Sequence, residues 1–101
     1  MALQSLSQAA VPARILNLTG PETLRVKDMA EKLGKLMGRS VSLEGTESGS
    51  ALLNNASEAH RLFGAPSVSA DTILGWIADW VRNGGENLGK PTHFESRDGR
   101  F

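Results

Sequence analysis

The sequence predicts a helix-rich α/β domain, α+β-like in its proportions, in which a small two-stranded parallel βαβ unit packs with about three further helices. Residues 26–37 place apolar side chains at helical spacing, and short segments before and after them alternate apolar with polar residues. Because strand, helix and strand follow one another with short turns, the pattern predicts a right-handed parallel crossover.

Residues 3–11 carry apolar side chains at helical spacing and predict a first helix, which Pro12 ends. No capping residue precedes this helix, so we interpret Met1 as a boundary cut into a longer protein. Residues 14–19 then alternate and predict the first strand, which ends at Gly20-Pro21.

The helix over residues 26–37 is the strongest prediction. Gly38 suits a left-handed residue just past its end, and Asp28 and Lys35 suit the helix dipole. Arg25, immediately before the apolar pattern, is a poor N-cap residue. Residues 40–44 alternate again and predict the second strand.

A polar, glycine-containing loop is predicted over Gly45–Ser50, and two short helices follow it. Asn54 or Asn55 can cap a helix that runs through Phe63, and Ser69 can cap the last helix. We therefore predict a compact domain over residues 1–85 and a tail over residues 86–101, either docked or flexible.

Composition excludes several classes of partner. Eleven basic residues balance eleven acidic ones, so neither nucleic acid nor an anionic membrane is an expected partner. The chain has no cysteine, no secretion signal and no apolar run near the roughly 20 residues that span a bilayer. We expect a cytoplasmic protein.

The chain offers little catalytic chemistry. It contains no tyrosine, so it cannot supply a tyrosine–lysine proton relay, and its glycines lack the spacing of a dinucleotide fingerprint. His60 and His93 belong to no metal-ligand motif, so we predict no metal site. Trp76 and Trp80 share a helix face, and we expect them in the core rather than in a ligand site.

The order of ILNLTG, PETLRV, an amphipathic helix, a short strand, NASEAHRLFGAP and a tryptophan-bearing helix resembles the C-terminal lobe of extended short-chain dehydrogenase/reductases, the NAD-dependent epimerase/dehydratase family. The resemblance runs from Ala2 to Phe101, and its most specific parts are Ser57–Pro66 and Lys90–Phe101. In that family an N-terminal Rossmann domain binds NAD(P) and carries the Tyr-x-x-x-Lys pair, while the smaller lobe covers a substrate that is commonly a nucleotide sugar.

The resemblance implies a substrate-binding domain whose cofactor, NAD(P), would belong to a Rossmann domain of the same parent chain, with no catalytic or cofactor-binding residue here. Nucleotide-sugar enzymes of the family often carry an arginine in the loop before the NASEAHRLFGAP helix. Residues 45–53 have no basic residue, so the substrate class stays open. Because loops on a rigid scaffold favour binding, we predict the following substrate-binding residues: Glu47, Ser48, Ser50, His93 and Arg97.

Two functions follow from the sequence. The first is the substrate-binding lobe of an NAD(P)-dependent epimerase, dehydratase or reductase, inactive by itself. The second is a free-standing module that binds a protein or a ligand through exposed helix faces.

Overall fold

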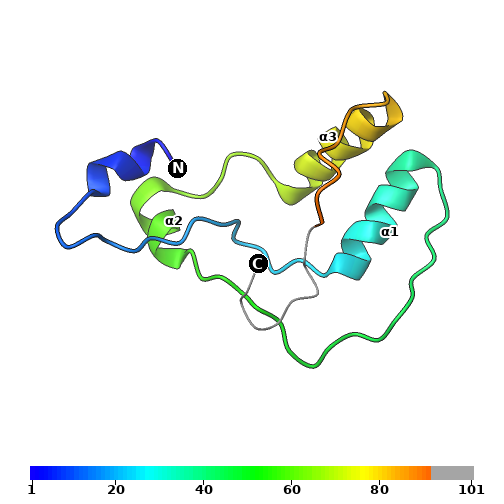
Figure 1. Cartoon of the computed structure of the whole chain (residues 1–101). Coiled ribbons are helices and arrows are strands. Elements are labelled where there is room, and N and C mark those ends of the chain that lie inside the picture. Colours follow the sequence, from blue (N-terminus) through cyan, green and yellow to red (C-terminus); the bar gives the residue numbers. More distant parts are fainter. Residues whose placement is uncertain (92–101) are drawn as a thin grey trace. The chain divides into compact units, whose positions relative to one another are not determined.

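The computed structural model describes residues 1–91, and all regular structure in that range is helical (Figure 1). A short 3-10 helix, η1, spans Gln4–Gln8, and three α-helices follow: α1 (Val26–Met37), α2 (Ser57–Phe63) and α3 (Ala70–Arg82). No strand forms within residues 1–91, so the prediction of an α/β fold with a parallel βαβ unit is wrong.

The two predicted strands fail because neither segment pairs with another. Residues 14–19 and 40–44 carry no helix or strand, and only two apolar residues in each segment support the alternation. A strand needs a partner that takes up its backbone hydrogen bonds, and a short alternating run does not specify one. Both segments instead lie against helices, the first against α2 and the second against α1.

The chain forms two compact units, which we describe separately. The first contains Met1–Leu24 and Leu53–Ile73, and the second contains Arg25–Leu52 and the described residues from Leu74 onward. The boundary therefore falls within α3. The predicted division into residues 1–85 and a tail from residue 86 stays a prediction.

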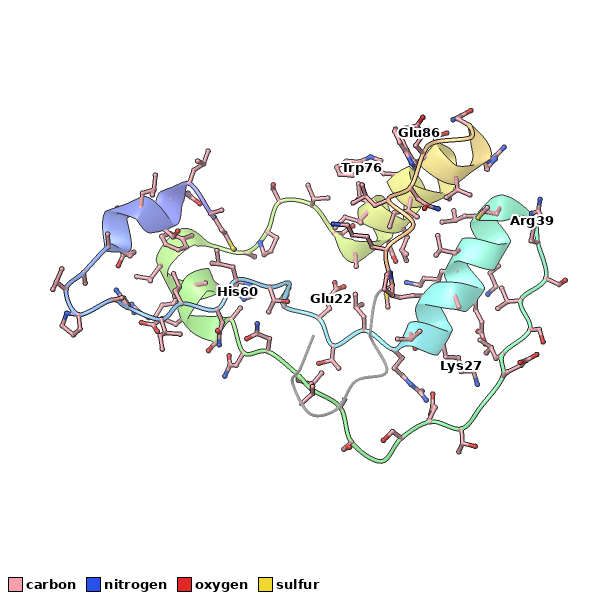
Figure 2. The ribbon with its side chains drawn as sticks, viewed as in Figure 1. Glu22, Lys27, Arg39, His60, Trp76 and Glu86 are labelled. Carbon is pink, nitrogen blue, oxygen red and sulfur yellow. The ribbon has the colours of Figure 1, made fainter. Side chains whose placement is uncertain are left out.

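In the first unit, polar side chains fasten the extended segment 14–19 to α2. Arg14 forms an ion pair with Glu58, and the Asn17 side-chain amide donates to the Asn55 carbonyl at 3.2 Å. His60 Nε2 lies 2.9 Å from the Thr19 carbonyl oxygen, on the side of α2 that the segment passes (Figure 2). Three contacts between residues far apart in sequence thus replace the predicted sheet pairing.

The first predicted helix is much shorter than its pattern suggests. Of residues 3–11, only Gln4–Gln8 are helical, as a 3-10 helix without a side-chain cap. The hydroxyls of Ser5 and Ser7 donate to the carbonyls three residues earlier, at 2.7 and 2.9 Å. Such local bonds compete with the α-helical backbone ladder, and an uncapped start gives the helix no compensation.

The predicted helix ends are confirmed where local chemistry determines them. Gly38 has φ 64° and ψ 34°, the left-handed conformation, and closes α1 through its amide. The Ser69 hydroxyl accepts a hydrogen bond from the Thr72 amide at 3.1 Å, as an N-cap does. Arg25 precedes α1 without any side-chain capping bond. The N-cap of α2 is Ala56, not the predicted Asn54 or Asn55, and it makes no side-chain capping bond. Asn55 lies one residue earlier, and its side chain accepts a hydrogen bond from the Ser57 amide at 3.0 Å.

In the second unit, two glycines allow close approaches that no other residue would. A Cβ atom on Gly34 would lie 2.3 Å from Val41 Cγ2 and 2.8 Å from the Arg39 carbonyl oxygen. One on Gly85 would lie 2.2 Å from the Trp80 ring. Real Cβ atoms do not approach so closely, so each position requires glycine.

Few apolar side chains are buried. Among residues 1–91 the buried hydrophobic residues are Ala56, Ala59, Leu74 and Ala78, and no large side chain is fully buried. Trp76 is 61% exposed and Trp80 is 58% exposed, so their predicted core position is wrong. The helical spacing of apolar residues does not show whether an apolar face packs inside the chain or is exposed on its surface. No helix in the described part of the chain is long and apolar enough to cross a membrane.

Candidate functional site

The predicted substrate loop meets a basic residue that lies outside it in sequence. Arg25 Nη2 donates to both carboxylate oxygens of Glu47, each at 2.8 Å. The hydrogen bond to Glu47 raises the pKa of the Arg25 guanidinium, and the charges of Glu47 and Asp28 add to this effect. Both partners are more than half exposed, so solvent weakens the pair and a ligand can reach either group.

Arg25 is the functional candidate that sequence reasoning missed. Residues 45–53 have no basic residue, yet the structure brings a guanidinium to the loop from the position just before α1. A guanidinium recognises phosphate and carboxylate groups with paired hydrogen bonds. The poor match of Arg25 to an N-cap was the one signal in the sequence that this residue serves another purpose.

The loop itself carries two hydroxyl groups beside the carboxylate. The Ser50 amide donates to the Ser48 Oγ at 3.4 Å, which bends the loop tightly around Gly49. Gly45, with φ 91°, begins the loop in a conformation that favours glycine. One short exposed stretch thus presents a carboxylate and two hydroxyls, those of Glu47, Ser48 and Ser50. The Arg25 guanidinium is hydrogen-bonded to the Glu47 carboxylate.

The other two predicted substrate residues, His93 and Arg97, lie outside the described residues. His60, the other histidine, is half-buried on α2 and bonded to the Thr19 carbonyl. Within residues 1–91, no group of three or more histidine, cysteine, aspartate or glutamate side chains is placed to hold a metal ion. The described part of the candidate site is a polar loop with Arg25 beside it.

The first unit also contains two open cavities that the sequence did not indicate. One, of about 330 Å³, is lined by residues 5–18 of η1 and the segment that follows it. The other, of about 590 Å³, lies between the start of the chain and the α2–α3 connection, and its wall includes Gln4, Leu18, Phe63 and Val68. Both volumes suit a small ligand, but their walls bring together no charged pair comparable with Arg25 and Glu47.

A second candidate surface lies on α3. Leu74 and Ala78 are buried on one side of this helix, while Trp76 and Trp80 lie nearly opposite them and are exposed. The apolar residues between these two sides, which complete the arc, are Ile73, Ile77 and Val81, each 43–50% exposed. Figure 2 shows the Trp76 side chain on this helix.

We call these five exposed residues (Ile73, Trp76, Ile77, Trp80 and Val81) the α3 apolar face. A helix that packs on one neighbour needs a single apolar stripe, whereas α3 is apolar around more than half of its circumference. The α3 apolar face therefore has the character of a surface that a further body covers.

Comparison of the chain with protein-family models, with curated proteins and with solved structures finds no match.

Proposed function

We propose that this chain is the substrate-binding domain of an NAD(P)-dependent epimerase, dehydratase or reductase of the cytoplasm, and that it is inactive alone. NAD(P) would be held by a Rossmann domain of the same parent chain, and hydride transfer would belong to that cofactor. The proposal rests on the sequence resemblance that runs from Ala2 to Phe101 and on two structural observations.

The α3 apolar face is the observation that carries the proposal. Burying one large apolar side chain is worth roughly 1.5–3 kcal/mol. Five such side chains remain exposed on one helix, while the buried hydrophobic residues of the described chain are mostly alanines. A domain with this balance gains stability from a large partner surface, and a cofactor domain of the same chain provides one at high effective concentration.

The loop over residues 45–50 supports the substrate-binding part of the proposal. The Glu47 carboxylate accepts hydrogen bonds from hydroxyls such as those of a sugar, and Ser48 and Ser50 both donate and accept them. Arg25 pairs with Glu47 and provides a guanidinium for a phosphate. A nucleotide sugar carries both kinds of group, so it is the substrate class that we favour. His93 and Arg97 are proposed to add to this site from the tail.

Chemical-shift mapping of the full chain tests this proposal. Titration with nucleotide sugars is expected to move the amide signals of residues 45–50 and the Arg25 side-chain signal, whereas NAD(P) is expected to move none. Glu47→Gln should weaken the response, because it removes the charge and keeps the size. Glu44→Gln, the same change at another exposed glutamate just before the loop, is the matched control. Unmoved loop and tail signals with every nucleotide sugar would contradict the proposed site.

A free-standing interaction module is the second candidate, and the exposed indole of Trp76 favours it. Such a module would bind a protein through the α3 apolar face without any cofactor domain. Sedimentation separates the two functions. Self-association that Trp76→Gln abolishes would favour the module, whereas a monomer that restores dinucleotide-dependent turnover when mixed with a Rossmann domain of the parent would exclude it.

A further inference from the structure

Asn83 and Gly84 form an asparagine–glycine pair just after α3, and local hydrogen bonds fix both residues. The Asn83 side-chain amide donates to the Asp79 carbonyl at 2.9 Å and to the Asp79 carboxylate at 3.1 Å. The next backbone amide, that of Gly84, donates to the Val81 carbonyl at 3.1 Å. Asn83 and Gly84 are nevertheless both exposed, so water reaches them.

The residues just after this pair contact one side of the Trp80 ring, which remains 58% exposed. The Gly85 amide donates to the Trp80 carbonyl at 2.9 Å, and the Trp80 indole donates to the Glu86 carbonyl at 3.0 Å. Gly85 lies so close to the ring that it cannot carry a Cβ atom. The chain from Asn83 to Glu86 therefore forms a short strap against the indole, and Figure 2 shows Glu86 beside α3, where the chain turns back along the helix.

We propose that Asn83 is a site of spontaneous amide hydrolysis, and that hydrolysis releases this strap from Trp80. Glycine after asparagine leaves the following backbone nitrogen unhindered, because glycine has no side chain. The bonds from Asn83 to Asp79 and from Gly84 to Val81 hold the two reacting groups while α3 is intact. The reaction then proceeds from states in which the last turn of the helix opens, as helix ends do.

The chemistry needs only water and a solvent base. The Gly84 nitrogen loses its proton to the base and attacks Cγ of Asn83, so that an N–Cγ bond forms, the Cγ–Nδ2 bond breaks and ammonia leaves. Water then opens the five-membered imide at either carbonyl. The product is aspartate, or isoaspartate with the main chain running through Cβ. No oxidation or reduction occurs.

Both products weaken the strap for electrostatic reasons. The new carboxylate stands where an amide donated to Asp79, so two negative groups replace a donor and an acceptor. It also lies at the C-terminal end of α3, where the helix dipole disfavours negative charge. Isoaspartate further lengthens the backbone between α3 and Gly85. The indole of Trp80 consequently becomes more exposed and the α3 apolar face becomes larger.

Incubation of the full chain at mildly alkaline pH, followed by peptide mapping by mass spectrometry, tests the modification. The wild type is expected to gain aspartate and isoaspartate at position 83, whereas Asn83→Gln, which keeps an amide but cannot readily form the five-membered ring, should gain neither. Asp79→Ala should accelerate the reaction about fivefold, because the loss of one hydrogen bond increases the open fraction by about that factor. Asp79→Asn, which retains an acceptor, should accelerate it less.

Fluorescence tests the consequence for Trp80. In a Trp76→Phe background, Asn83→Asp is expected to shift Trp80 emission to longer wavelength and to raise its quenching by acrylamide, while Asn83→Gln should change either signal less. Absence of modification at position 83 during prolonged incubation would overturn the proposed site. Modification without any change in Trp80 emission would overturn the proposed release of the strap.

Discussion

The two compact units hold their segments in different ways. In the first, exposed or half-buried polar side chains join residues far apart in sequence, as Arg14 joins Glu58 and His60 joins Thr19. In the second, backbone and side chain approach each other closely at Gly34 and Gly85, where any added atom collides. The first unit is therefore held together by polar contacts that are individually weak. The second depends on close steric packing at two glycines, where a larger side chain would clash.

The largest expected effect is at Gly34. Gly34→Ala should lower the free energy of unfolding by about 1–3 kcal/mol, because overlap with Val41 and the Arg39 carbonyl outweighs the helix propensity of alanine. Urea unfolding measures the change. Gly75→Ala in α3, where nothing lies within 4 Å of the new Cβ, is the matched control and should stabilise by about 0.5–1 kcal/mol. If both variants were stabilised, the close approach in the second unit would be refuted.

The second close contact, between Gly85 and the Trp80 ring, can be tested by changing both residues. Gly85→Ala should destabilise by about 1–2 kcal/mol, somewhat less than Gly34→Ala because the Trp80 ring can rotate away while a carbonyl cannot. Combining it with Trp80→Ala should remove most of that cost, so that a double-mutant cycle gives a large coupling. Additive effects would mean that the ring is not what excludes a side chain at position 85.

The largest polar effect is expected at His60 in the first unit. His60→Ala removes the hydrogen bond to the Thr19 carbonyl and should cost about 0.5–1.5 kcal/mol. His60→Gln, whose amide can donate to the same carbonyl, should recover part of the loss. If His60→Ala lowered the free energy of unfolding more than Gly34→Ala does, the first unit would contain the stronger contact, contrary to this comparison. Urea unfolding of the three proteins in one buffer decides between these outcomes.

The smallest effects are expected for two exposed ion pairs, Arg14–Glu58 in the first unit and Arg25–Glu47 in the second. Arg14→Ala and Arg25→Ala should each lower the free energy of unfolding by less than His60→Ala does, and the loss should decrease in high salt because exposed charges are screened. Unfolding of both variants at low and at high salt measures this. A large, salt-independent loss in either one would show a pair more protected from solvent than the exposed fractions indicate.

The sequence predicted those features that neighbouring residues determine. The helix over residues 26–37, its left-handed Gly38 and the capping Ser69 follow from spacing and local hydrogen bonding, and the structure confirms them. The strands were wrong because pairing depends on a distant partner, which the alternation of two apolar residues in each segment cannot specify. Arg25 was missed for the same reason, since its bond to Glu47 joins residues that no local rule connects. Trp76 and Trp80 were placed in the core because an apolar stripe does not reveal which body covers it.

Our central proposal is that this chain binds the substrate of a larger enzyme and carries no redox chemistry of its own. A steady-state assay of the purified chain with NAD(P), NAD(P)H and a panel of nucleotide sugars tests it most directly, through the absorbance of the reduced nicotinamide and through product analysis. The account predicts no turnover with any combination. Turnover that follows the chain through size-exclusion chromatography, and that Glu47→Gln reduces, would contradict it.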